Sequence, residues 1–175
     1  MRILILLAIF LTGTFVRPCA GWGKEDRIIH RLARQQARTD RKDFAFMYFR
    51  SLLREHPDSR YADFALFGQG EYFFELPNYK LATESFESYV DQYPDAKGKL
   101  FALAYLLKMA RTQGQIQRVK DLEKEIISVK QLGLVFSDYK EYTYRTPLNR
   151  EFKTVFHIDR IEFYVGGKLF EKITY

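Results

Sequence analysis

The chain has 175 residues, of which 47% are hydrophobic and 29% are charged, and its formal net charge is +6. This size and apolar content allow one domain with a continuous core plus a small appendage. Without Arg2 and Arg17, which lie in the first twenty residues, the net charge falls to +4. That excess is too small to indicate nucleic acid as a partner.

The first twenty residues have the order that is typical of a secretory signal peptide. Met1 and Arg2 precede an apolar stretch, and Cys19, Ala20 and Gly21 give a small-residue exit. The apolar stretch is shorter than the roughly 20 residues of a membrane-spanning helix. We therefore expect residues 1–20 to be removed as a signal peptide and the mature protein to be periplasmic or associated with the outer membrane.

Cys19 is the only cysteine, so its removal would leave no disulfide or thiolate chemistry. The alternative is that Cys19 becomes the lipidated first residue of a lipoprotein. Arg17 and Pro18 stand before it, whereas lipoprotein processing requires small uncharged residues. We therefore favour removal and keep lipidation as the alternative.

An internal repeat with a period of 37 residues occupies the middle of the chain. A period of this length is typical of stacked structural repeats. Residues that turn or end helices recur at Asp40, Pro77 and Gly114, which indicates a third, less regular copy. The first and second copies also match elsewhere: Ala45 with Ala82, Phe49 with Phe86, and Pro57 with Pro94.

Each copy is predicted to form one helix, a tight turn and a second antiparallel helix. A single hairpin of this kind cannot bury its own apolar face, so neighbouring hairpins must stack. The small residue of each copy then lets helices approach closely, and the aromatic residue fills the gap between hairpins. The predicted helix pairs are 24–39 with 42–56, 60–76 with 79–93, and 97–113 with 116–130.

The second copy resembles a tetratricopeptide repeat. Gly70, Phe73, Ala82, Phe86 and Pro94 stand at the spacing of that family. The resemblance implies a mainly α fold, in which about three helical hairpins form a right-handed solenoid. We assign this repeat domain to residues 21–131.

The residues that follow each repeat's proline, such as Asp58 to Asp63, lengthen the repeat. This longer variant is similar to the periplasmic BamD and YbgF/CpoB types. That resemblance implies a role in outer-membrane assembly or in coordination of the envelope.

The remaining segment, residues 132–175, has the composition of β-strands, being rich in Tyr, Phe, Val, Ile and Thr. Gly166 and Gly167 separate two apolar runs, 160–165 and 168–173, which predicts a β-hairpin with a two-residue turn. A simple two-residue register would place Glu162 opposite Glu171.

An isolated hairpin is only marginally stable in water. We therefore expect this one to gain a third strand around residues 154–158, to pack on the last helix, or to pair with another chain. The final strand would form an open edge. Self-association through this strand, giving a homo-oligomer, is an open alternative.

Catalytic and metal-binding patterns are sparse. His30, His56 and His157 have no second ligand three or four residues away, as a helical metal pair would require. Glu71 and Glu75 lie one helical turn apart, a spacing that suits acid/base chemistry but more often forms a polar helix face. We predict no catalytic residue, no cofactor and no metal.

A partner-binding groove is predicted on the concave face, which in this family is lined by the first helix of each repeat. Its centre is aromatic and acidic and its ends are basic, which suits an extended peptide. The alternative is that the phenylalanines cover neighbouring helices. The predicted groove residues are Arg34, Phe64, Phe67, Glu71, Phe74, Glu75, Lys108 and Arg111.

These features predict an exported, non-enzymatic scaffold that binds a protein or peptide partner in the bacterial cell envelope. Two alternatives remain open. One is a peripheral membrane or cell-wall component that uses its basic tail, and the other is an accessory subunit of an envelope enzyme.

Overall fold

The computed structural model describes residues 23–136 and 141–175. The expected signal peptide, including Cys19, lies outside the described residues. Six helices come first: α1 (Glu25–Arg38), α2 (Lys42–Glu55), α3 (Ala62–Glu75), α4 (Tyr79–Gln92), α5 (Lys99–Thr112) and α6 (Ile116–Phe136). Four strands follow: β1 (Glu141–Arg145), β2 (Glu151–Phe156), β3 (Arg160–Val165) and β4 (Lys168–Thr174).

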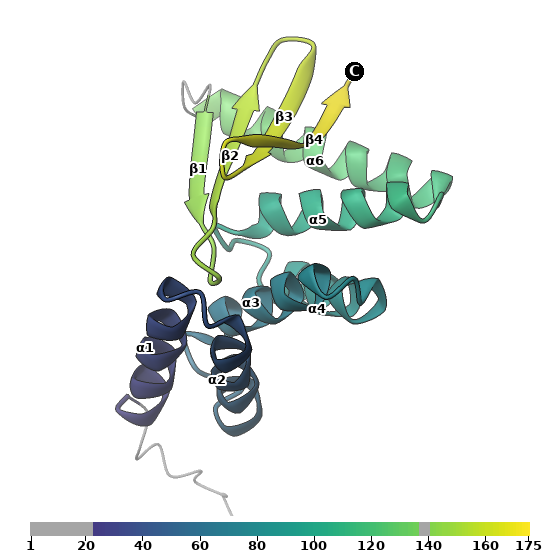
Figure 1. Cartoon of the computed structure of the whole chain (residues 1–175). Helices are drawn as coiled ribbons and strands as arrows, with labels where there is room; N and C mark the ends of the chain where they lie inside the picture. The colour runs from purple at the N-terminus through teal and green to yellow at the C-terminus, as the bar shows by residue number, and fades with distance from the viewer. Residues whose placement is uncertain (1–22, 137–140) are drawn as a thin grey trace, which may run out of the picture.

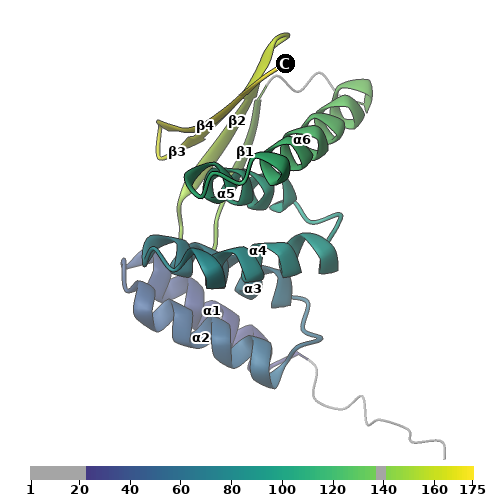
Figure 2. The same ribbon diagram turned by 90° about the vertical axis from the view of Figure 1, so that its right-hand side faces the viewer.

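Consecutive helices pack as antiparallel pairs, α1 with α2, α3 with α4 and α5 with α6, and the three hairpins stack in chain order (Figures 1 and 2). Glu25, Ala62 and Lys99 begin the first helices of the three pairs at intervals of 37 residues. The predicted helical repeats are therefore confirmed. The last helix is longer than expected and ends at Phe136 instead of residue 130.

Turn chemistry fixes where the hairpins bend. Asp40 and Gly114, at equivalent places between the two helices of the first and third pairs, have φ angles of 57° and 67°. Aspartate and glycine are among the residues that adopt this left-handed conformation most easily. In the second pair, the side chain of Asn78 accepts a hydrogen bond from the backbone N–H of Leu81 and caps α4.

Two glycines of α3 allow the hairpins to approach closely. A Cβ atom added to Gly68 would lie 2.4 Å from the ring of Phe49, and one added to Gly70 would lie 2.9 Å from the ring of Phe86. Both rings are buried, so neither is free to move aside. The small and aromatic positions of the repeat therefore pack directly against each other, as the repeat pattern predicts.

We expect Gly70→Val to destabilise the protein by about 1–3 kcal/mol, because the added side chain would overpack the space that the Phe86 ring already fills. Urea unfolding followed by circular dichroism measures this loss. The matched control is Gln69→Val, which introduces the same side chain at a partly exposed neighbour on the same helix. Equal losses in the two variants would mean that valine's low helix propensity, and not the packing at Gly70, explains the effect.

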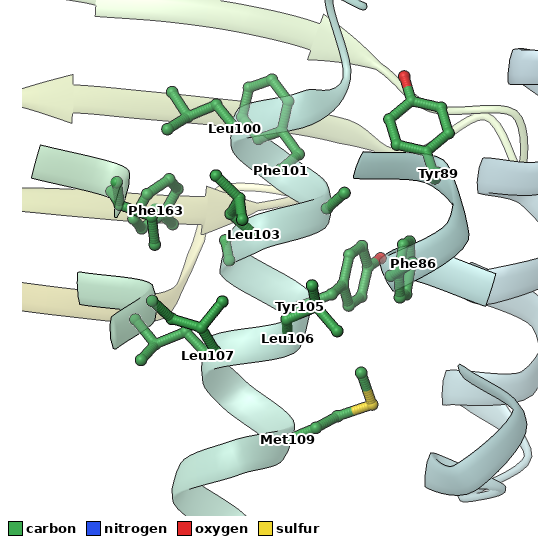
Figure 3. Close-up of a cluster of buried hydrophobic side chains, with 14 of the residues drawn as sticks. Phe86, Tyr89, Leu100, Phe101, Leu103, Tyr105, Leu106, Leu107, Met109 and Phe163 are labelled. Atoms are coloured by element: carbon green, nitrogen blue, oxygen red, sulfur yellow. The ribbon is translucent and has the colours of Figure 1, made fainter. Parts of the chain in front are cut away.

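The largest core cluster surrounds α5. Leu103, Leu107 and Met109 of α5 are almost fully buried, as are Phe101 and Tyr105. Figure 3 shows these side chains pointing from α5 both toward Phe86 of α4 and toward Phe163 of β3. A helix covered on several sides needs no polar face, which explains why α5 is apolar over most of its length.

The strands form one antiparallel sheet in the order β1-β2-β3-β4. The hairpin predicted around Gly166 and Gly167 is present, with φ angles of 54° and 77° at the turn. The expected third strand is β2, and β1 adds a fourth. The expected pairing of Glu162 with Glu171 is wrong, because a β-bulge shifts the register so that Glu162 lies opposite Lys172.

The bulge places Glu171 opposite Phe163, on the side of the sheet that faces the helices. Phe152, Ile161, Phe163 and Ile173 share this side and belong to the same buried cluster as α5 and α6. The sheet therefore packs on the last helical pair, as one of the sequence-based alternatives proposed. Among the described residues, no helix combines the length and the apolar character that crossing a membrane requires.

Candidate partner-binding groove

The sheet and the turn between β1 and β2 cover much of the face on which the groove is predicted. Figure 1 shows this turn reaching away from the sheet toward α1. The Phe101 ring of α5 stacks on Tyr144 of β1, with 5.3 Å between ring centroids. Tyr105 lies 5.2 Å from Phe152 of β2 and 5.1 Å from Phe170 of β4. The chain's own C-terminal segment thus occupies the centre of the groove.

The two central phenylalanines contact this segment. Phe67 is fully buried and lies 5.6 Å from Tyr144 and 5.2 Å from Tyr89, measured between ring centroids. Phe74 is partly buried and lies 5.9 Å from Phe170. Both rings therefore serve internal packing in this structure, which is the alternative that the sequence left open for the groove phenylalanines.

Glu71 is a buried carboxylate that holds the β1–β2 turn. Its side chain has no exposed surface, accepts a hydrogen bond from the Tyr105 hydroxyl at 3.1 Å, and accepts another from the backbone N–H of Leu148 at 3.2 Å. Burial raises the pKa of Glu71 to about 7, although a hydrogen bond with Thr146 and the charge of Arg150 oppose the rise. The protonated form is therefore accessible near neutral pH.

Glu75, one helical turn further along α3, forms ion pairs with two cations. Lys42 of α2 donates to it at 2.9 Å, and Arg150, just before β2, also donates to it. These pairs tie the first two helical hairpins to the sheet. The two acids that could have served acid/base chemistry are thus both occupied by structural contacts.

The basic end on α5 is also paired with the sheet. Arg111 donates to the carboxylate of Glu171 and to the backbone carbonyl of Lys172, and it also pairs with Glu123 of α6. The Lys108 ammonium lies 3.9 Å from Glu171 and 5.8 Å from the centroid of the Phe170 ring. Six of the eight predicted groove residues therefore contact the C-terminal segment: Phe67, Glu71, Phe74, Glu75, Lys108 and Arg111.

The other two predicted residues, Arg34 and Phe64, lie at the end of the groove that remains open. They border a small hollow of about 70 Å³ between α1 and the β1–β2 turn. Its other lining residues are Arg38, Arg145, Thr146, Pro147 and Asn149. We call this region the open end of the groove.

His30 forms part of the wall beside the open end. Its ring stacks on Tyr61 at 4.1 Å between centroids and meets Phe64 edge to face at 4.6 Å. Burial, together with the positive charges of Arg34 and Arg60, lowers the pKa of His30 to about 4. The imidazole is therefore neutral at neutral pH, and arginine side chains supply the positive charge of this region.

Residues 64–96 match the family model of the tetratricopeptide repeat. The matched segment contains most of α3, all of α4 and the residues that lead to the third hairpin. No curated protein matches the chain. Tetratricopeptide repeats commonly mediate protein–protein interactions and are generally not catalytic.

Sequence reasoning missed the residues that close the groove. Tyr105 lies within a run of apolar residues that gives it no distinguishing pattern, and Arg150 lies between two strands without any motif. Glu171 was seen only as a cross-strand neighbour of Glu162. The available signal was the accumulation of aromatic residues on both the groove and the tail, which together form too much apolar surface to remain exposed.

Within residues 23–136 and 141–175, no group of three or more His, Cys, Asp and Glu side chains is placed to hold a metal ion. The titratable groups of the groove centre are committed to hydrogen bonds and ion pairs. The arrangement is suited to holding parts of one chain together and, at the open end, to contacting another molecule.

Proposed function

We propose that this protein is an exported, non-enzymatic scaffold of the bacterial cell envelope that binds a protein or peptide partner. The observation that carries the proposal is the open end of the groove, where Arg34, Phe64 and Asn149 border a hollow on a solenoid of tetratricopeptide type. Repeat solenoids bind their partners on such concave surfaces.

The envelope location rests on the sequence of residues 1–20 and on the resemblance to the BamD and YbgF/CpoB types. The proposed location is the periplasm or the outer membrane, and the proposed role is in outer-membrane assembly or envelope coordination. Detection of the protein in the envelope fraction of the producing cells, and its loss when residues 1–20 are deleted, would support export.

The alternative function, contact with anionic lipid or cell-wall polymer through a basic tail, is less well supported than the scaffold, because several basic side chains of the sheet are paired with acids. Arg145 pairs with Glu151 at 2.9 Å, Lys153 with Glu141 at 2.8 Å, and Arg160 with Glu162 at 2.8 Å. These ion pairs reduce the positive charge that the tail offers to a surface.

Self-association through the final strand also receives less support. β4 is at the edge of the sheet, but it carries the β-bulge and exposes the charged side chains of Lys168 and Lys172. Bulges and lysines are features that protect edge strands from pairing with other chains.

A photo-crosslinking residue at position 149 tests the proposed binding surface directly. Asn149 is exposed on the turn that borders the open end, so we expect a discrete crosslinked partner in envelope extracts. The matched control carries the same residue in place of Glu84, which is exposed on α4. Crosslinks from position 84 alone would place the partner elsewhere, and none from either position would count against the scaffold.

A further inference from the structure

The open end of the groove is bordered by a row of arginines on α1. Arg31, Arg34 and Arg38 are spaced by three and four residues, so they lie on one side of the helix. All three side chains are exposed. We call Arg31, Arg34 and Arg38 the arginine row.

Among the described residues, no acidic side chain pairs with the arginine row, whereas other basic groups of the groove have such partners. Arg111 pairs with Glu123 and Glu171, and Arg150 pairs with Glu75. In the part of the chain that the structure describes, no carboxylate lies within ion-pair distance of the three arginines of the row. Their positive charge is therefore available to a ligand.

The surface around the row is recessed. Arg34 and Arg38 border the hollow of about 70 Å³, whose opposite wall is the β1–β2 turn with Arg145. Arg31, Arg34 and Arg38 also line a wide, open surface region together with His30 and Gln35, and all of these residues belong to α1. A single side chain can enter the small hollow between α1 and the β1–β2 turn, whereas a flat lipid surface would meet only its rim.

The spacing of the row sets the geometry of a matching ligand. Arg34 and Arg38 are one turn apart, which is a rise of roughly 6 Å along the helix axis. In an extended peptide, side chains on the same face are two residues apart, or roughly 6.5–7 Å. Carboxylates at alternate positions of an extended chain would therefore meet successive arginines of the row.

We propose that the arginine row binds an extended acidic peptide segment of the partner, with carboxylates at alternate positions. The inference rests on the proposed function and names the chemistry of its partner. One carboxylate would enter the small hollow and meet Arg38, because arginine and carboxylate form strong charge-assisted hydrogen bonds. The next carboxylate would meet Arg34, and a third would meet Arg31 on the open part of the surface.

A peptide fits this surface better than a single-stranded nucleic acid. Sequence-tolerant binding of single strands needs exposed aromatic faces on which bases can stack. The His30 ring, which lines the same open surface as the arginines, is already stacked on Tyr61 and contacts Phe64 edge to face. The aromatic residues thus form a wall of the groove and offer no free stacking platform beside the arginines.

The test measures binding of a fluorescent peptide in which Glu and Ser alternate, by fluorescence anisotropy with the purified chain. A peptide in which Gln and Ser alternate controls for the charge of the ligand. We expect the acidic peptide to bind and Arg34→Glu with Arg38→Glu to weaken binding by roughly tenfold or more. The matched control protein is Arg54→Glu with Lys80→Glu, which makes the same change in net charge at exposed positions away from the groove.

Several outcomes would overturn the inference. If both double variants bind the acidic peptide equally weakly, the peptide responds to the net charge of the protein and the arginine row is not a specific site. Binding of anionic vesicles or of a single-stranded oligonucleotide, but not of the acidic peptide, would assign the row to another ligand. A partner that crosslinks at position 149 and still binds the Arg34→Glu, Arg38→Glu variant would leave the scaffold function intact and refute the acidic segment.

Discussion

Phe152→Ala is expected to destabilise the helices and the sheet together, by about 3–5 kcal/mol. Phe152 of β2 is fully buried, and its ring lies 5.0 Å from Phe101 and 5.2 Å from Tyr105, both on α5. Truncation would leave a cavity at the junction between the last helical pair and the sheet. Urea unfolding should be followed by circular dichroism for the helices and by hydrogen exchange for the strands.

The control for this experiment is Leu169→Ala on β4, because 57% of the Leu169 side chain is exposed and its truncation leaves no cavity. We expect Leu169→Ala to change the unfolding free energy by less than about 1 kcal/mol. If Phe152→Ala melts the strands while the helices remain as stable as before, the shared core does not couple the two parts. The sheet would then be a detachable cover of the groove.

Glu71→Gln should change how stability depends on pH. The pKa of Glu71 is raised from 4.5 to about 7 in the folded protein. The folded state therefore holds a proton that the unfolded state loses, and stability falls as pH rises from about 4.5 through about 7. The full effect is on the order of 3 kcal/mol. Glutamine cannot ionise, so the stability of the variant lacks this pH dependence. The unfolding free energy of the variant, relative to that of the wild type, should therefore rise by about this amount as the pH increases from 4 to 8.

Glutamine can also keep the local hydrogen bonds. Its carbonyl oxygen can accept from the Leu148 N–H, and its amide can donate to the Tyr105 hydroxyl, which then reverses its role. Urea unfolding at pH 4, 6 and 8 measures the difference, with Glu84→Gln on the exposed side of α4 as the control. A constant difference between Glu71→Gln and wild type at all three pH values would contradict the raised pKa.

The helical part of the fold could be predicted because the residues that determine each hairpin lie close together in the sequence and recur in the next copy. The same small and aromatic positions recur after 37 residues, and Gly70 with Phe86 shows that these positions contact each other as the spacing requires. The hairpin at Gly166 and Gly167 could be predicted for the same reason, since a two-residue turn depends mainly on its own residues.

The state of the groove could not be predicted from local patterns. Whether Phe67 faces a partner or Tyr144 depends on contacts between segments far apart in the chain. The β-bulge near Phe163 had no clear signal either, yet it decides that Glu171 points toward Arg111 instead of toward solvent. Arg34 and Phe64 border the open end of the groove. That no described carboxylate pairs with Arg34 could not be read from the sequence, because it depends on the segments that surround α1.

The strands that cover the groove follow the helices in the chain. Ribosomes make α1–α6 before β1–β4, so during synthesis the rings of Phe101 and Tyr105 have no strand to pack against. Apolar surface exposed at this stage favours aggregation and recruits chaperones. A nonsense mutation that removed residues 141–175 would make this exposure permanent. Such a product is expected to be cleared by cellular quality control even though all six helices are encoded.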